Sequence, residues 1–247
     1  MNEFLLYNQD NLELMRSMED NSVDLIYSDI LYGTGRDFGP YQDIKKNFEE
    51  IQNFYRPRFL EFKRILKDTG NIIIQMDYHI NYMIRFLLDE IFGMNNFRNE
   101  IIWHYNSAPH KKGCLGHRHD TLLRYTKSNV FTFNEVVREP YSPTAPRGYE
   151  KEKYYHPEGK LVGDVWQIKM IGQNDKTERT GYPTQKPLEL MNRIVKLFSN
   201  EGDMVFDAFM GSGSIGMAAL QNNRKFIGCD ISEEAYNITK ERLESML

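Results

Sequence analysis

An aspartate and a tyrosine near the start of the chain have the types and the spacing to bind a flat polar ligand. Asp29 closely follows an apolar run over 23–27, which predicts a buried strand, and Tyr32 precedes a glycine-rich loop. Open α/β sheets bind ligands at the carboxyl ends of their strands. There the tyrosine ring could stack on a planar base while the Asp29 carboxylate accepts a hydrogen bond from its exocyclic amine. The alternative is that Asp29 caps a turn and Tyr32 packs in the core.

A second candidate site lies near the other end of the chain, in the segment Asp207-Ala208-Phe209-Met210-Gly211-Ser212-Gly213. Glycines between a strand and a helix permit a tight turn and a close approach of the backbone to a ligand. Asp230 ends the next predicted strand about twenty residues further on, where a carboxylate can bind both hydroxyls of a ribose. The spacing predicts a nucleoside-binding βαβ unit. The alternative is a plain turn, with Asp230 capping the last helix.

The same glycines leave a second enzyme class open. Residues 211–216 read Gly-Ser-Gly-Ser-Ile-Gly and match the G-x-G-x-x-G spacing of nicotinamide-binding proteins. A nicotinamide-dependent dehydrogenase is therefore an alternative, and features elsewhere in the chain must distinguish the two classes.

The elements expected around these segments alternate between strands and helices. Apolar runs and helical spacing predict strands over 4–7, 23–27, 71–76, 204–206 and 225–229, and helices over 48–67, 80–92, 187–198 and 215–221, with Ser232 capping a final helix. Pro57 is expected to kink or divide the helix over 48–67. This alternation predicts an α/β fold with a doubly wound, Rossmann-like, mainly parallel sheet.

The middle of the chain, 99–182, differs in character. It holds five prolines and many tyrosines and histidines, with short strand-like pieces such as 130–133, so we expect an irregular insertion with long loops. The formal net charge of −4 argues mildly against a nucleic-acid partner. Basic residues nevertheless gather between 101 and 128, and a local basic face is expected there. The candidate contacts to DNA are Lys111, Lys112, Arg118 and Arg124.

Composition limits the remaining classes. The chain has 247 residues, of which 40% are hydrophobic and 27% charged, as in ordinary globular domains. No apolar run approaches the roughly 20 residues that cross a bilayer, and no signal segment is evident at the start. Cys114 and Cys229 make no disulfide framework, which favours a reducing cytoplasm. Cys114, His117 and His119 offer three potential zinc ligands without an evident fourth, so no metal site is expected.

The order of these segments resembles one known family. The segment 29–32, the basic aromatic middle, the stretch Pro183-Thr184-Gln185-Lys186-Pro187 and the glycine loop 207–213 together resemble the beta group of S-adenosylmethionine-dependent DNA amino-methyltransferases. That group has the order catalytic motif, target-recognition region, cofactor motif. The resemblance covers nearly the whole chain and divides it into a catalytic part over 1–98, a target-recognition insertion over 99–182 and a cofactor-binding part over 183–247.

The resemblance implies roles for particular residues. Asp29 and Tyr32 match the ends of the family's Asp-Pro-Pro-Tyr motif, in which the amine's protons go to the Asp29 carboxylate and to the carbonyl of Ile30. The cofactor contacts that it implies are Asp10, Asp29, Thr184, Gln185, Lys186, Asp207, Phe209, Gly211, Gly213 and Asp230. Ile30 and Leu31 replace both prolines of the catalytic motif, and Ala208 replaces the proline after Asp207. Because proline fixes φ near −65°, we expect a less preorganised loop that keeps its activity.

The activity implied is methyl transfer to the N6 amine of an adenine flipped out of duplex DNA. An acidic first residue in the motif is associated with adenine, so N4-cytosine methylation is the alternative. A catalytically weakened DNA-binding homologue is a further one. A homodimer and a cognate restriction endonuclease are possible partners, and no membrane is expected.

Overall fold

The computed structural model describes residues 3–39, 42–45, 47–106, 112–141 and 156–246. Its centre is an eight-stranded sheet in the order β1-β10-β9-β2-β3-β5-β4-β8. The strands are β1 Phe4–Asn8, β2 Val23–Asp29, β3 Leu66–Met76, β4 Phe97–His104, β5 His119–Thr126, β8 Val165–Gln167, β9 Met204–Asp207 and β10 Lys225–Asp230. Every pairing in this sheet is parallel except those that β5 makes with β3 and β4. The expected mainly parallel α/β sheet is confirmed.

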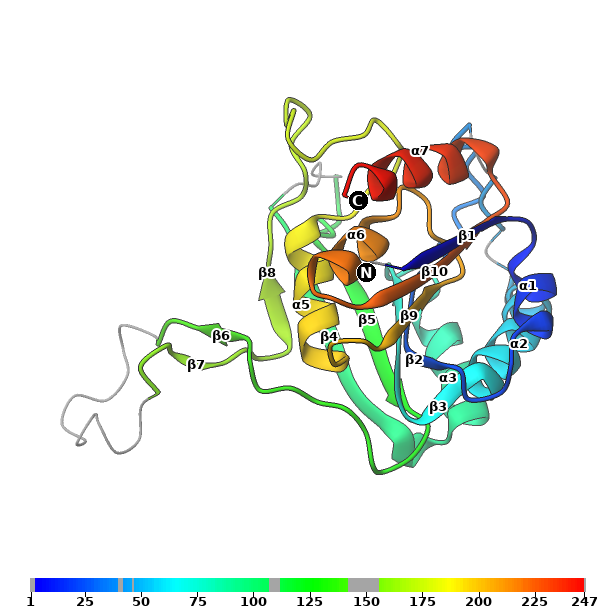
Figure 1. Ribbon diagram of the computed structural model, residues 1–247. Coiled ribbons are helices and arrows are strands. Elements are labelled where there is room, and N and C mark those ends of the chain that lie inside the picture. Colours follow the sequence, from blue (N-terminus) through cyan, green and yellow to red (C-terminus); the bar gives the residue numbers. More distant parts are fainter. Residues whose placement is uncertain (1–2, 40–41, 46, 107–111, 142–155, 247) are drawn as a thin grey trace.

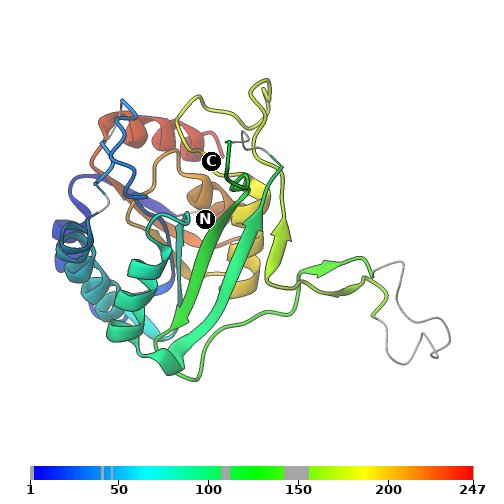
Figure 2. The ribbon, with the colours of Figure 1, turned by 180° about the vertical axis from the view of Figure 1, so that it is seen from behind.

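Helices cover both faces of this sheet (Figures 1 and 2). One face carries α1 Asn11–Ser17, α2 Phe48–Ile65 and α3 Asn81–Phe92, and the other carries α5 Leu188–Phe198, α6 Ser214–Gln221 and α7 Glu233–Glu244. A separate apolar core lies on each side. Successive residues of one strand point into opposite cores: Ile72 and Ile74 of β3 pack in the first core and Ile73 in the second. None of the helices in the described ranges is long and apolar enough to cross a membrane.

Capping side chains explain where helices α1 and α7 begin. The Asp10 carboxylate accepts hydrogen bonds from the backbone of Leu12 and Glu13 and so caps α1. Ser232 accepts from the Ala235 N–H and caps α7, as expected. Helix α2 runs through Pro57 without being divided.

The middle segment is more regular than expected, because three of its parts form strands. β4, β5 and β8 belong to the central sheet, and β4 crosses the expected boundary between 98 and 99. No strand forms over 130–133. A short hairpin of β6 Arg138–Glu139 and β7 Lys160–Leu161 projects away from the body of the molecule (Figure 1). The sheet therefore extends well into the region expected to be loops.

Candidate active site and cofactor pocket

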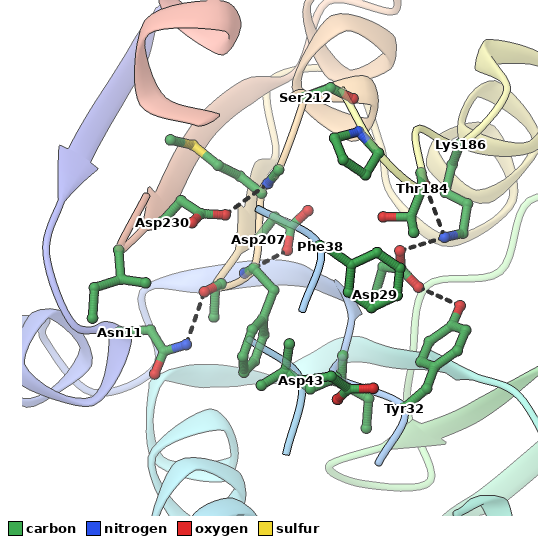
Figure 3. Close-up of a pocket in the computed structure, with 18 of the residues that line it drawn as sticks. Asn11, Asp29, Tyr32, Phe38, Asp43, Thr184, Lys186, Asp207, Ser212 and Asp230 are labelled. Carbon is green, nitrogen blue, oxygen red and sulfur yellow. Dashed lines mark hydrogen bonds and ion pairs between the residues drawn. The ribbon is translucent and has the colours of Figure 1, made fainter. Parts of the chain in front are cut away.

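A cavity of about 360 Å³ opens where the carboxyl ends of β2, β9 and β10 meet (Figure 3). Strand β2 leads through α2 to β3 on one side, while β9 leads through α6 to β10 on the other, so β2 and β9 flank the point where the strand order reverses. Open α/β sheets bind ligands at such a switch point. Asp29 ends β2 and Asp207 ends β9, and both line the cavity. Segments far apart in the sequence therefore share one site.

The glycine loop and Asp230 form one side of the cavity. Gly211 has a left-handed φ of 47°, and its N–H donates to the Asp230 carboxylate at 2.9 Å. A second oxygen of Asp230 accepts from the Ser232 N–H at 2.9 Å. Burial raises the pKa of Asp230, while these backbone hydrogen bonds lower it. The carboxylate is thus fixed at the edge of the pocket, where ribose hydroxyls could reach it.

The two later glycines of the G-x-G-x-x-G match serve the fold rather than the cavity. Gly213 has φ 71° at the start of α6, and a Cβ there would lie 2.5 Å from the Thr239 side chain. A Cβ on Gly216 would lie 2.6 Å from the Phe226 ring. Neither glycine is among the residues that line the cavity. The match is therefore explained by a tight turn and by packing of α6 against β10, without a nicotinamide cofactor.

Asp10 and Asp207 also line the cavity. The Asp10 carboxylate bonds the Arg58 guanidinium at 2.8 Å while it caps α1. Asp207 is buried and accepts from the Phe209 N–H at 3.0 Å. Burial raises the pKa of Asp207 well above its usual value.

Residues 184–186 line the cavity on the side away from Asp230 (Figure 3). Thr184 has a left-handed φ of 59°. The Gln185 side chain accepts from Thr180 at 2.8 Å and donates to the Glu178 carbonyl at 2.8 Å, so it shapes the loop in addition to lining the pocket. The Lys186 ammonium bonds the Asp29 carboxylate and the Thr184 carbonyl. The resemblance implies that Lys186 lies near the cofactor, and it does not predict the ion pair of Lys186 with Asp29.

Asp29 is held between a cation and a hydroxyl. The Tyr32 hydroxyl donates to the second Asp29 oxygen at 2.6 Å, and the side chain of Asp29 is 18% exposed. Burial raises the pKa of Asp29, while Lys186 and Tyr32 lower it. Burial also raises the pKa of Tyr32 well above its usual value, so this hydroxyl stays protonated and acts as a donor. The site thus pairs a carboxylate acceptor with an aromatic ring at the end of a strand.

Residues 29–32 are held in place without the two prolines of the family motif that they resemble. The Ile30 N–H donates to the Gln75 carbonyl at 3.2 Å, which a proline could not do, and the Ile30 side chain is buried in the core. The buried Tyr55 hydroxyl donates to the Leu31 carbonyl at 2.9 Å. These bonds, together with Ile30 packing, fix the segment that prolines would otherwise stiffen.

Asp43 holds the loop that follows Tyr32. Its buried carboxylate accepts from the backbone N–H groups of Gly33 at 3.1 Å and Thr34 at 2.7 Å, and from the Thr34 hydroxyl at 2.5 Å. Sequence reasoning missed Asp43, because it belongs to no recognisable motif. Figure 3 shows it among the cavity residues, close to Tyr32.

The four basic candidates for DNA contacts differ in their placement. Lys111 lies outside the described residues, and Lys112 and Arg118 are exposed. Arg124 is 3% exposed, and its guanidinium donates to Asn71 at 3.0 Å and Asn99 at 3.1 Å. The expected contact of Arg124 with DNA is wrong, because its side chain is buried and its guanidinium lies over the Phe198 ring. Burial and nearby Arg98 lower the pKa of Arg124 to about 10.

The three potential zinc ligands do not converge. The His117 ring stacks on Tyr78 with centroids 3.7 Å apart, and Cys114 is exposed. Among the residues that the structure describes, no group of three or more His, Cys, Asp or Glu side chains could hold a metal ion.

Comparison with solved structures identifies the fold as that of class I methyltransferases. The complex of M1.HpyAVI with S-adenosylmethionine matches with a TM-score of 0.67 at 22% identity, covering 97% of this chain and 98% of that one. The PvuII cytosine-N4-specific DNA methyltransferase matches with a TM-score of 0.72 at 16% identity, covering 98% and 86%. Residues 23–241 match the N6_N4_Mtase family model, described as DNA methylase, and the chain belongs to this family.

Curated relatives agree with this assignment. The chain is 34% identical to the type II methyltransferase M.HpaI of Haemophilus parainfluenzae over 95% of this chain and 72% of that protein. It is 30% identical to the DNA adenine methyltransferase YhdJ of Escherichia coli K12 over 95% and 81%. The chain is thus an S-adenosylmethionine-dependent DNA methyltransferase.

The cavity suits the cofactor of this family. S-adenosylmethionine has a ribose, an adenine and a cationic sulfonium. The cavity offers the fixed carboxylate of Asp230, the apolar side chains of Phe209 and Ile231 beside it, and the carboxylates of Asp29 and Asp207. The carboxylates can accept hydrogen bonds from hydroxyls and favour a positive charge, and the apolar side chains can cover a planar ring.

Proposed function

We propose that this protein transfers the methyl group of S-adenosylmethionine to the exocyclic N6 amine of an adenine flipped out of duplex DNA. The observation that carries this proposal is the placement of the Asp29 carboxylate beside the Tyr32 ring, in the cavity that also holds Asp230. The relative named a DNA adenine methyltransferase supports the choice of base.

When bound, S-adenosylmethionine supplies an electrophilic methyl group. The target amine is a poor nucleophile because its lone pair is delocalised into the ring. Hydrogen bonds from its two protons to the Asp29 carboxylate and the Ile30 carbonyl favour a pyramidal nitrogen with a localised lone pair. Positioning and electrostatics then supply most of the rate acceleration.

Lys186 gives Asp29 the charge state that this role requires. A protonated Asp29 would carry an O–H donor on one oxygen and would lose the negative charge that makes it a strong acceptor. Burial favours that protonated form, and the ammonium of Lys186 opposes it. Lys186 therefore keeps an acceptor available for the amine.

The ring of Tyr32 is the proposed stacking surface for the flipped base. Removing a base from the duplex costs on the order of a few kcal/mol, which stacking and phosphate contacts offset. Lys112 and Arg118, both exposed near the start of β5, are the proposed phosphate contacts. Lys111 is proposed from the sequence alone.

We also propose the cofactor's contacts. Asp230 holds the ribose, Phe209 and Asp10 lie near the adenine, and Gly211 allows close approach of the loop. Thr184, Gln185, Lys186, Asp29 and Asp207 face the methionine end. Gly213 acts through the turn rather than by contact. A homodimer, a cognate restriction endonuclease and a cytoplasmic location stay predictions.

The test is to incubate the protein with duplex DNA and methyl-labelled cofactor, digest the DNA and separate its nucleosides. The expected product is labelled N6-methyldeoxyadenosine, absent with an Asp29→Ala variant. Label only in deoxycytidine would overturn the choice of base, in favour of N4-cytosine methylation. Activity that persists in Asp29→Ala would overturn the proposed role of this carboxylate.

A further inference from the structure

A second carboxylate, that of Asp120, also accepts a hydrogen bond from the Tyr32 hydroxyl, and the proposed function assigns it no role. Asp120 of β5 is 5% exposed, and its carboxylate accepts hydrogen bonds from three side chains. The Tyr105 hydroxyl donates to Oδ1 at 3.0 Å, and the Gln75 amide and the Tyr32 hydroxyl donate to Oδ2 at 2.9 and 3.0 Å. All three donors are neutral. A carboxylate buried in such surroundings is costly to keep, which calls for an explanation.

The orientation of Asp120 is fixed by the neighbouring strands. Gln75 lies on β3 next to β5, and its amide oxygen accepts from the buried Tyr27 hydroxyl of β2 at 2.7 Å. That bond turns the amide nitrogen of Gln75 toward Asp120. The row Tyr27, Gln75 and Asp120 thus crosses three strands and presents one carboxylate oxygen to Tyr32.

The Tyr32 hydroxyl has two carboxylate acceptors and only one proton. It lies 2.6 Å from Asp29 Oδ1 and 3.0 Å from Asp120 Oδ2. It can therefore make a full hydrogen bond to only one of them at a time. The shorter of the two contacts involves the carboxylate that the target amine needs. The hydroxyl there occupies one of the acceptor positions of Asp29 Oδ1, which makes this oxygen a weaker acceptor for the amine.

We propose that Asp120 is a positioning residue that accepts the Tyr32 hydroxyl when a base enters, releasing Asp29 for the amine and holding the Tyr32 ring in place. This inference rests on the proposed function of Asp29. Asp120 does not touch the base; it acts through Tyr32. No proton is gained or lost by either carboxylate, since the hydroxyl only changes its acceptor.

A double-mutant cycle separates this role from a purely structural one. In Asp120→Ala, the Tyr32 hydroxyl keeps Asp29 as its acceptor and leaves Oδ1 a weaker acceptor for the amine. We expect the single-turnover rate of methyl transfer, with DNA and cofactor saturating, to fall roughly tenfold or more. In Tyr32→Phe the hydroxyl is gone while the stacking ring remains. Adding Asp120→Ala to Tyr32→Phe should then cost no more than about twofold.

Conservative replacements and a remote control complete the design. Asp120→Asn keeps an acceptor oxygen for Tyr32, so its rate should stay within about threefold of the parent. Asp89→Ala removes a different carboxylate that a buried tyrosine contacts, Tyr125 at 2.5 Å, and should lower the melting temperature without changing the rate. Asp120→Ser replaces Asp120→Ala in the cycle if the alanine variant does not fold, because its hydroxyl can still satisfy Gln75.

The outcomes are distinct. Equal losses from Asp120→Ala in the parent and in the Tyr32→Phe variant would overturn the proposal and leave Asp120 a structural residue. So would an Asp120→Asn rate as low as that of Asp120→Ala. The rate is measured as label in DNA whichever base accepts it, so a wrong choice of base leaves the cycle intact. A parent protein that transfers no label would overturn the proposed function, and this inference with it.

Discussion

Replacing Lys186 by methionine tests whether its ammonium keeps Asp29, the proposed acceptor for the target amine, ionised. Methionine preserves most of the side-chain length but removes the ammonium that bonds Asp29. The Lys186 side chain is 9% exposed and that of Asp29 18%, so little water can take the place of the lost charge. Burial then raises the pKa of Asp29 with only Tyr32 to oppose it. The ionised form of Asp29, which is the acceptor that the amine needs, therefore becomes less populated.

The size of the effect follows from the bond removed. A hydrogen bond to a charged group contributes about 1.5–3 kcal/mol. At roughly 1.4 kcal/mol per tenfold change in rate, Lys186→Met should lower kcat about 10- to 100-fold at neutral pH. Activity requires the ionised form and the pKa rises, so the acid limb of the pH–rate profile moves to higher pH. Much of the rate should return in alkaline buffer.

The assay is label transfer to duplex DNA at saturating cofactor, measured across a series of pH values. Lys67→Met is the matched control, since Lys67 bonds Asp24 at 2.8 Å outside the cavity, and its profile should equal that of the parent. A Lys186→Met profile with the parent's acid limb would refute the argument, even if the rate were uniformly lower.

Four further substitutions test the roles assigned to other residues. Asp230→Ala should weaken binding of S-adenosylhomocysteine about 10- to 100-fold by calorimetry, because it removes a charged acceptor of the ribose hydroxyls; unchanged affinity would contradict that role. Gly213→Ala should lower the free energy of unfolding by about 1–2 kcal/mol in urea, because φ is 71° there and Thr239 blocks a Cβ; an unaltered midpoint would contradict this. Arg124→Met should reduce stability without changing DNA affinity, whereas Arg118→Met should weaken DNA binding and flatten its salt dependence. The reverse result would restore Arg124 as a DNA contact.

The parts of the fold that follow from local patterns were predictable from the sequence. Apolar runs ending in Asp29 and Asp230 marked β2 and β10, and the glycine segment marked the turn before α6. Each of these signals lies within a few consecutive residues. The strand positions in turn brought Asp29 and Asp230 to one edge of the sheet.

Strand β5 shows what such patterns miss. Its buried residues include Asp120, Thr121, Arg124 and Thr126, so it lacks the apolar character of an interior strand. Some of the partners that make this burial tolerable lie far away in the sequence; Asn71, which bonds Arg124, is 53 positions from it. A basic residue was for that reason assigned to the DNA surface although it belongs to the interior.

The ion pair of Lys186 with Asp29 could not be predicted from local sequence patterns either, because its partners are distant in the sequence. The two residues are 157 positions apart, and only the strand order brings them together. The replacement of the catalytic prolines is also explained by distant partners. Gln75 and Tyr55 hold the backbone of Ile30 and Leu31, so the expected loss of preorganisation is offset.

The central claim is that Asp29 directs methyl transfer to adenine N6. Single-molecule sequencing of DNA from cells that express the protein reports the modified base and its sequence context together. We predict N6-methyladenine at one recurring sequence, absent from cells that express Asp29→Ala at the same level. Modification confined to cytosine, or equal adenine methylation by the Asp29→Ala variant, would contradict the claim.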